Sequence, residues 1–189
     1  MFTLPSFFYA FFRPLILPIK EVDSNLPEKG KIFDLGCGEG IIAKQLATKK
    51  ERLVIGIDLD KSRLPKSSVQ NLKFIYGDIK RFQPKNVSGV VLSDVLHHLF
   101  FSDQRKLLAR IASGLKKDGI LIIKEIDTKE FIRSKLSRFW DFIFYPKDRI
   151  YYWNSNELKD SLLELGFKVK IIRPCRFFPG STTLFICKK

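Results

Sequence analysis

Residues 32–40 read IFDLGCGEG, and residues 56–58, further along the chain, read GID. In each stretch an apolar run ends in an acid, Asp34 in the first and Asp58 in the second. A glycine-rich turn and then an apolar-periodic helix follow Asp34. Glycines let a backbone approach a ligand and adopt dihedral angles that a Cβ forbids. An acid about twenty residues after such a turn lies where it accepts hydrogen bonds from ribose hydroxyls. The pattern predicts a strand–turn–helix–strand unit with a nucleoside site at the carboxyl ends of its strands.

The spacing of the glycines narrows the choice of ligand. Gly36, Gly38 and Gly40 are followed by Ile41, whereas a dinucleotide-binding turn has the pattern G-x-G-x-x-G. No Lys-Ser or Lys-Thr pair follows the glycines, which excludes a P-loop. Asp34, at the end of the first apolar run, would repel a pyrophosphate but suits a cationic amino-acid group.

These residues resemble the class I S-adenosylmethionine-dependent methyltransferases. Asp34 and the three glycines match the first motif of that family, and Asp58 matches the ribose-binding acid after the second strand. The resemblance implies S-adenosylmethionine as the cofactor. Asp34 and the turn from Gly36 to Gly40, which includes Cys37, are then expected to hold its methionine end.

The ends of the later strands complete the expected cofactor site. Asp78 matches the family's acid that contacts the adenine amino group, although an ordinary turn residue is the alternative interpretation. Leu59 and Ile79 are expected to pack on the adenine. Ser93 or Asp94, at the end of the fourth strand, is expected near the methionine moiety.

Apolar runs that alternate with helical patterns predict a doubly wound α/β fold with right-handed crossovers. The first five expected strands cover residues 31–35, 52–58, 72–76, 87–93 and 120–126. Two final strands, 167–172 and 182–187, are separated by a connection too short for a crossover helix, so they should pair antiparallel. The expectation is a mostly parallel seven-stranded sheet with an antiparallel last strand, as the resemblance to Rossmann-like methyltransferases also implies.

Helix signals lie between and after these strands. Ser102 and Ser155 are predicted caps, Gly166 is a predicted helix end, and Asp118-Gly119 is a predicted turn before the fifth strand. Apolar positions over residues 129–144 keep helical spacing and predict a long amphipathic helix.

The chain has 189 residues, enough for one domain with a sizeable core. Residues 28–189 are the expected methyltransferase domain, preceded by an aromatic and apolar segment over residues 1–27. Prolines and Arg13 interrupt that segment too early for a transmembrane helix, and it makes a poor signal peptide. It is expected either to dock on the domain as a lid over the substrate or to lie in a membrane interface.

The net charge of +14 favours an anionic partner, either nucleic acid or an anionic membrane surface. The alternative is a lysine-rich, solvated surface without such a role. Three dispersed cysteines form no C-x-x-C pair and only two histidines are present, so no metal site is expected. An odd number of dispersed thiols suits a reducing, cytoplasmic location.

Catalytic residues are expected at the carboxyl ends of the fourth and fifth strands. His97 or His98 is a candidate general base, because histidine titrates near neutral pH; the alternative is that the pair opens a helix. Glu125 and Asp127 share one face of the fifth strand and are candidates to orient a substrate hydroxyl or to act as the base. Aromatic residues further on form either a pocket wall or core packing: Tyr145, Tyr151, Tyr152 and Trp153.

Stretches such as DVLHHL (94–99) and ILIIKEID (120–127) are similar to a subgroup of small methyltransferases associated with lipid, polyene or polyketide-type biosynthesis. This resemblance implies methyl transfer to an oxygen, or to a carbon, of a small, aromatic or lipid-like acceptor. Together with the phenylalanine-rich N-terminus and the positive charge, it suggests peripheral contact with the inner face of a membrane.

Two other functions remain open. Lys20, Asp94 and Lys124 fall roughly where RNA ribose methyltransferases place a Lys-Asp-Lys set, but the final Glu of that set has no match in residues 167–189. An Asn/Asp-Pro-Pro-aromatic motif, typical of amino-directed nucleic-acid enzymes, is also absent after the fourth strand. Nucleic acid is therefore the less favoured partner. The third function is that of a non-catalytic subunit that binds S-adenosylmethionine.

Overall fold

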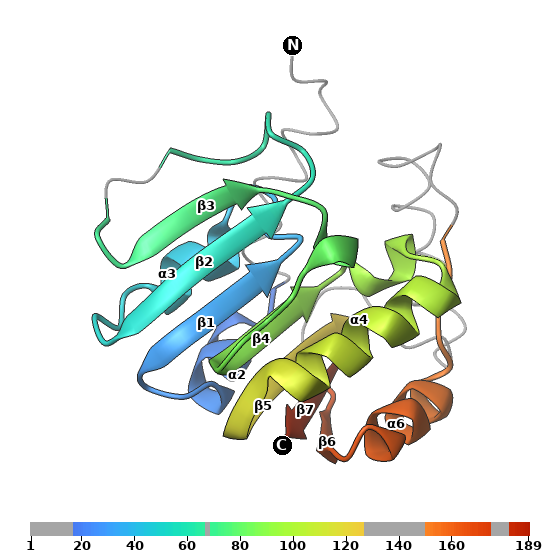
Figure 1. The fold of residues 1–189 in the computed structure, drawn as a ribbon. Helices are drawn as coiled ribbons and strands as arrows, with labels where there is room; N and C mark the ends of the chain where they lie inside the picture. The colour runs from blue at the N-terminus through green and yellow to red at the C-terminus, as the bar shows by residue number, and fades with distance from the viewer. Residues whose placement is uncertain (1–16, 67–68, 127–149, 175–181) are drawn as a thin grey trace.

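The computed structural model describes residues 17–66, 69–126, 150–174 and 182–189. Within these residues the chain forms one seven-stranded sheet with helices on both faces (Figure 1). The strands, in chain order, are β1 (Gly30–Leu35), β2 (Arg52–Asp58), β3 (Leu72–Tyr76), β4 (Val87–Ser93), β5 (Leu115–Glu125), β6 (Lys168–Ile172) and β7 (Thr183–Lys188). Across the sheet their order is β3-β2-β1-β4-β5-β7-β6.

The sheet has the predicted direction pattern. Strands β1 to β5 pair in parallel with their neighbours, whereas β7 is antiparallel to both β5 and β6. Among the described strands, β7 alone therefore runs against the others. The doubly wound, Rossmann-like fold with an antiparallel last strand is confirmed.

The strand order reverses between β1 and β4, and this reversal creates the place for a ligand. The chain leaves β1 toward β2 and β3 on one side, and β4 and β5 follow on the other side. Leu35, the last residue of β1, pairs with Ile57 of β2 and with Leu92 of β4. In open α/β sheets, ligands bind outside the carboxyl ends of the strands at such a switch point.

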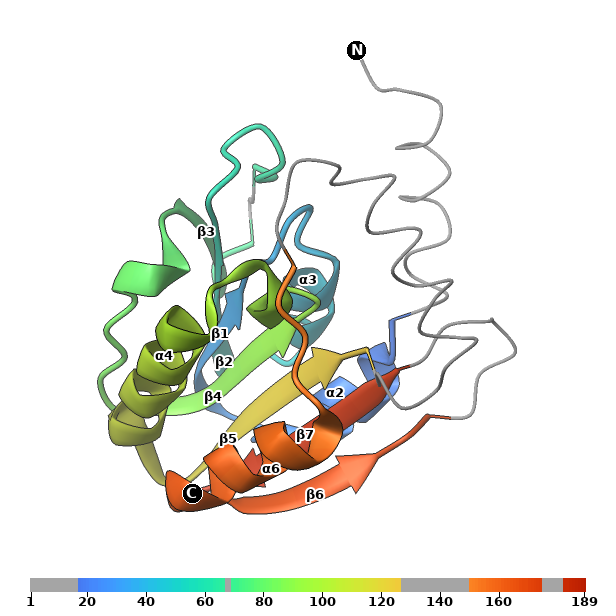
Figure 2. The ribbon, with the colours of Figure 1, turned by 90° about the vertical axis from the view of Figure 1, so that its right-hand side faces the viewer.

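Two apolar cores lie on opposite faces of the sheet, beneath the helices that Figure 2 shows on its two sides. Helices α2 (Ile19–Asn25) and α3 (Ile41–Leu46) cover one face, and α4 (Phe101–Gly114) and α6 (Ser155–Glu164) cover the other. Because both faces are covered, the central strands consist of nearly continuous apolar residues. No helix within the described ranges is long and apolar enough to cross a membrane.

Arg52, at the start of β2, is fully buried and ties the N-terminal residues to the sheet. Its guanidinium donates to the carbonyl oxygens of Pro27 (2.8 Å) and Leu26 (3.3 Å) and to the Asp23 carboxylate. A buried cation is tolerated when it is paired and fully hydrogen-bonded. Residues 17–27 therefore pack on the domain, and the boundary after residue 27 stays a prediction.

Helix α4 begins earlier than the predicted cap at Ser102. Its cap is Phe100, which offers no side-chain hydrogen bond. The Phe100 carbonyl accepts hydrogen bonds from the amides of Asp103 and Gln104, both at 2.9 Å. The helix therefore begins at Phe101, and the prediction of Ser102 as its cap was wrong.

Helix α6 begins one residue after its cap, and that cap is Asn154 rather than Ser155. The Asn154 side chain accepts a hydrogen bond from the amide of Asn156 (3.0 Å), and the Glu157 carboxylate accepts one from the amide of Asn154 (3.3 Å). This reciprocal arrangement is a capping box. Gly166, with φ of +83°, follows the helix end as predicted.

Strand β5 is longer than predicted. It begins at Leu115, which pairs with Val87, and the register then shifts before Ile120 resumes the pairing. Asp118 lies in this irregularity with φ of +66°, so the predicted turn at Asp118-Gly119 is a local distortion inside the strand. The other strand ends agree with the predictions to within one residue. The helix predicted over 129–144 lies outside the described residues.

Gly36→Ala should destabilise the fold by about 1–3 kcal/mol. Gly36 has φ of +73°, and a Cβ at this position would lie 2.3 Å from a Val95 methyl carbon. Gly77→Ala is the matched control, because a Cβ there would approach Ile57 no closer than 3.4 Å. Urea denaturation measures both changes. Equal stability of the two variants would contradict the assigned backbone conformation of the turn.

Candidate active site

The carboxyl ends of the parallel strands open into one cleft of about 1080 Å³. Residues after β1, β2, β3 and β4 line it, and Tyr151, which precedes α6, closes one side. Of the predicted cofactor residues, the cleft brings together six: Gly36, Asp58, Leu59, Asp78, Ile79 and Asp94. An adjoining smaller pocket holds a further group, which includes Asp34, Cys37 and Ser93.

The glycine turn is held at the end of β2 by backbone hydrogen bonds. The amides of Gly36 and Cys37 both donate to the carbonyl oxygen of Ile57, at 2.7 and 3.1 Å. Gly40 has φ of +71° and caps α3 without a side chain. The turn therefore runs close over the strand ends, where its backbone can contact a ligand.

Asp34 lies under this turn and is almost fully buried. Its carboxylate accepts a hydrogen bond from the Ala43 amide at 3.1 Å, which fixes it against the first turn of α3. Ser93 lies across the same small pocket, and its buried Oγ has no hydrogen-bond partner within the described ranges. A carboxylate and an unsatisfied hydroxyl facing one pocket suit the polar end of an amino-acid ligand.

The Cys37 thiol is directed into the protein rather than toward the cleft. It is buried, and a Cβ on Gly56 would lie 2.8 Å from its sulfur. Burial, together with the nearby carboxylates of Asp34 and Asp58, raises the pKa of the Cys37 thiol far above its ordinary value. Cys37 therefore stays a neutral thiol at physiological pH, and its contribution to a ligand site comes from its backbone.

Asp58, the last residue of β2, connects the turn to the cleft. One carboxylate oxygen accepts a hydrogen bond from the Gly38 amide (2.7 Å), and the other accepts one from the Asp60 amide (2.8 Å). Each carboxylate oxygen has a second lone pair, so both can still accept a hydrogen bond from a ribose hydroxyl. Leu59 follows Asp58 and leaves 62% of its surface exposed in the cleft.

Asp78 caps a short helix and also lines the cleft. Its carboxylate accepts a hydrogen bond from the Lys80 amide at 2.8 Å and so caps the short helix η1 (Ile79–Arg81). Asp78 and Ile79 also line the cleft, as Leu59 does. The cap fixes the carboxylate without using all of its acceptor positions, so a hydrogen bond to an amino group remains available.

An ion pair lies at the end of β4. The sequence indicated its two residues only through their resemblance to the Lys-Asp-Lys set of RNA ribose methyltransferases. Both oxygens of Asp94 lie 2.6 Å from the ammonium nitrogen of Lys124 on β5. Asp94 has φ of +53°, which is uncommon for a residue other than glycine. Lys124 is nearly buried, whereas Asp94 lines the cleft.

The two adjacent histidines, in η2 (Leu96–His98), have different surroundings. His97 is buried, and its Nδ1 lies 2.6 Å from the Glu125 carboxylate. His98 instead lines the large cleft. Glu125 therefore faces His97 rather than the cleft, and Asp127 lies outside the described residues.

The aromatic residues before α6 also divide between the cleft and the buried surroundings of His97. Tyr151 lines the cleft, and its ring centroid lies 4.8 Å from that of Phe100. Tyr152 packs on His97 at 5.0 Å, and the Trp153 indole donates a hydrogen bond to Gln104. Tyr145 belongs to the residues that the structure does not describe.

Two residues of this wall were missed in the sequence. Phe100 lines the cleft, and the fully buried Gln104 donates to the carbonyl oxygens of Leu99 (2.8 Å) and Tyr151 (3.1 Å). For Gln104, the sequence did contain a signal: a glutamine stands among the apolar positions of α4. A buried amide there needs hydrogen-bond partners inside the protein.

Comparisons with known proteins place this site in a methyltransferase-like domain. A methyltransferase domain family matches residues 33–123. An uncharacterized protein of Methanocaldococcus jannaschii is 30% identical over 138 residues, which are 67% of this chain and 51% of that protein. A carboxy-S-adenosyl-L-methionine synthase of Pasteurella multocida is 31% identical over 105 residues, which are 50% and 44% of the two chains.

Solved structures share the fold at low sequence identity. The magnesium protoporphyrin IX methyltransferase of Synechocystis PCC 6803, crystallised with bound SAH, has a TM-score of 0.74 and 18% identity. That similarity covers 100% of this chain and 89% of the other. Residues 33–123 therefore match a methyltransferase domain, and the chain has the fold of the class I S-adenosylmethionine-dependent methyltransferases. It spans about half the length of the curated relatives it matches.

The side chains at the strand ends fit the cofactor of this family. Asp34 and Ser93 face the pocket beside the glycine turn, where a cationic amino acid needs acceptors. Asp58 offers carboxylate lone pairs for a ribose. In the same cleft, Leu59 would offer an apolar contact to an adenine, and the capped Asp78 would offer an acceptor.

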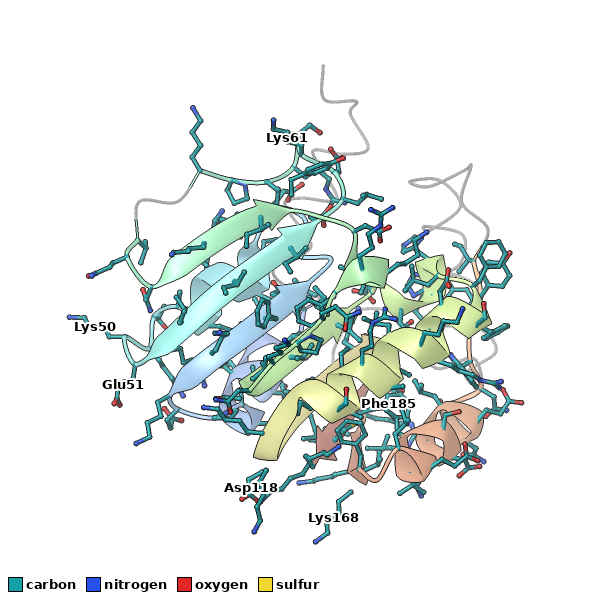
Figure 3. The ribbon with its side chains drawn as sticks, in the orientation of Figure 1. Lys50, Glu51, Lys61, Asp118, Lys168 and Phe185 are labelled. Carbon is teal, nitrogen blue, oxygen red and sulfur yellow. The ribbon has the colours of Figure 1, made fainter. Side chains whose placement is uncertain are left out.

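Asp58→Ala should weaken the binding of S-adenosylhomocysteine by about 1–3 kcal/mol, the usual cost of losing hydrogen bonds to a carboxylate. Isothermal titration calorimetry measures the affinity. Glu51→Ala removes an exposed carboxylate at the opposite end of β2 (Figure 3) and should leave the affinity unchanged. An unchanged affinity in Asp58→Ala would contradict the role of Asp58 at the ribose.

Proposed function

We propose that this chain transfers a methyl group from S-adenosylmethionine to an oxygen of a small, aromatic or lipid-like acceptor. One observation carries the proposal: the acids Asp58 and Asp78 line the same cleft as His98, Phe100 and Tyr151. Ligand pockets usually measure about 300–1,000 Å³. A cleft of about 1080 Å³ has room for a nucleoside cofactor and for an acceptor beside it.

The residues of the chain have to position the reactants, because the cofactor brings its own reactive group. When bound, S-adenosylmethionine supplies a methyl group on a positively charged sulfur. Asp34 and the turn over residues 36–40 would fix one end of the ligand, and Asp58 would fix its middle. Such positioning supplies up to about 7–11 kcal/mol in favourable cases.

His98 is the proposed proton acceptor for the hydroxyl of the acceptor. Its neighbour His97 is engaged by Glu125, whereas His98 lines the cleft near the ends of β4 and β5. A positioned base contributes about 10²–10⁴-fold to a rate. Transfer to a carbon of an electron-rich ring is the alternative reaction at the same site.

The wall beside His98 supports an aromatic or lipid-like acceptor. Leu99, Phe100 and Tyr151 line this side of the cleft, and the Phe100 and Tyr151 rings pack together at 4.8 Å. Rings offer large apolar surfaces to another ring or to an alkyl chain. The carboxylates, in contrast, lie mainly on the side proposed for the cofactor.

Location and the role of the N-terminal segment are proposed on sequence grounds. Dispersed cysteines suit the cytoplasm, and Cys37 and Cys187 are free thiols in the described part of the chain. Residues 1–27 are proposed as a lid or as a membrane-docking segment. The oligomeric state stays open.

RNA ribose methylation is the second candidate, and the Asp94–Lys124 pair favours it. The 2.6 Å contacts join two members of the Lys-Asp-Lys set that resembles the RNA enzymes. Lys20, the third member, is exposed on α2. A ribose hydroxyl is also an oxygen acceptor, so the two candidates differ in substrate rather than in chemistry.

His98→Gln should lower kcat about 10²–10⁴-fold, because the acceptor hydroxyl loses its base. Binding of S-adenosylhomocysteine should change little. His97→Gln is the comparison: it should lower the melting temperature, because Glu125 then lacks its partner in a buried site. If His98→Gln retains full turnover, a base role for His98 is excluded.

Incubation with methyl-labelled S-adenosylmethionine and fractionated cell extract tests the function directly. Label is expected in the lipid or small-molecule fraction and should be lost with Asp58→Ala. Label in RNA would support the second candidate. Tight binding of S-adenosylhomocysteine without label in any fraction would support a non-catalytic subunit and contradict the proposal.

A further inference from the structure

Exposed apolar side chains gather around the mouth of the cleft. In the described part of the chain, three of the most exposed large hydrophobic residues line the cleft: Leu59 (62%), Tyr76 (59%) and Phe100 (56%). Phe101 (41%) follows Phe100 and packs on Tyr151 of the same wall at 5.7 Å. These four residues are called the apolar rim below. Large apolar side chains grouped in this way usually mark an interaction surface.

Cationic side chains surround the same opening. Lys61, Arg63 and Lys80 line the cleft together with Leu59, Tyr76 and Phe100 of the apolar rim. Two acids of the cleft lie deeper than Lys80: its side chain is 48% exposed, compared with 26% for Asp78 and 20% for Asp94. Lys61 and Lys80 therefore present positive charge outward beside one exposed acid, Asp60, whereas Asp78 and Asp94 lie further inside the cleft.

Backbone amides and a lysine already engage those acids. Asp58 and Asp78 accept hydrogen bonds from backbone amides, and Asp94 is paired with Lys124. The acids that line the cleft keep their charge, so the attraction to an anionic surface comes from the exposed Lys61 and Lys80 and from the net charge of +14. An anionic surface would be attracted to the cations, while the apolar rim could enter the boundary between headgroups and acyl chains.

We propose that the apolar rim and its cations, Lys61, Arg63 and Lys80, dock the mouth of the cleft onto an anionic lipid bilayer. An amphiphilic acceptor then enters the cleft directly from the bilayer. This inference rests on the proposed function, because it names the source of the lipid-like acceptor. It places membrane contact on the described domain, in addition to any contact made by residues 1–27.

The side-chain geometry favours lipid over nucleic acid as the occupant. Stacking of bases needs open ring faces. Phe101 is instead packed in T-shaped contacts with Tyr151 and Trp153, at interplanar angles of 72° and 81°. Leu59, the most exposed member of the rim, has no ring on which a base could stack. Aliphatic and aromatic side chains interspersed with lysine and arginine are typical of membrane-interface surfaces.

Vesicle co-sedimentation of the full chain tests the proposal. The protein should bind vesicles of phosphatidylcholine mixed with phosphatidylglycerol and should bind phosphatidylcholine alone much more weakly. Lys61→Glu should weaken binding to the anionic vesicles about tenfold, because one attractive charge becomes repulsive. Phe101→Ser should also weaken it, through loss of an inserted ring.

Matched controls separate this surface from general charge and hydrophobicity. Lys168→Glu makes the same charge change at the opposite end of the sheet from Lys61 (Figure 3). Leu163→Ser removes an exposed apolar side chain (45%) on α6, which does not line the cleft. Both controls should bind anionic vesicles as the unmodified protein does. Circular dichroism melting checks that each variant is folded.

Several outcomes would overturn the docking surface. Absence of binding to anionic vesicles is one, and an equal loss of binding in Lys168→Glu and Lys61→Glu is another. Selective loss of RNA binding in Lys61→Glu, with vesicle binding intact, would identify the opening as a nucleic-acid surface instead. Calorimetry with S-adenosylhomocysteine is independent of these results. Failed vesicle binding with intact cofactor binding overturns the surface alone, whereas failed cofactor binding overturns the proposed function.

Discussion

The 2.7 Å hydrogen bond from the Gly38 amide to the Asp58 carboxylate is the contact on which the site depends. It joins the turn after β1 to the end of β2, and the amides of Gly36 and Cys37 strengthen the junction through the Ile57 carbonyl. The turn fixes the start of α3 and the pocket beside Asp34. The carboxylate is thus oriented by the backbone before any ligand arrives, which lowers the cost of binding.

From this junction the carboxyl edge of the sheet divides into two halves. The ends of β1, β2 and β3 carry acids fixed by backbone amides, which suit a nucleoside. The ends of β4 and β5 carry the Asp94–Lys124 pair, and His98 and the ring of Tyr151 lie on the same side of the cleft. The strand order reverses between β1 and β4, so the two halves meet where a methyl group would pass from one ligand to the other.

Local sequence patterns predicted the strands and the glycine turn, because strands buried on both faces are continuous apolar runs and the turn needs residues that adopt positive φ. The different roles of His97 and His98 could not be predicted, because they depend on Glu125, which lies 28 positions further along the chain. Arg52 reads as a surface cation in the sequence, and only tertiary contacts show it fully buried. Helix starts were misplaced where a carbonyl or a neighbouring asparagine served as the cap.

A crystal structure of the protein with S-adenosylhomocysteine tests the central claim most directly. The account predicts the amino-acid end of the ligand in the pocket of Asp34 and the glycine turn, with the ribose hydroxyls on the Asp58 carboxylate. The adenine should lie between Leu59 and Ile79, and the sulfur should face the side of the cleft that holds His98. A ligand bound elsewhere, or a ribose without contact to Asp58, would contradict the account.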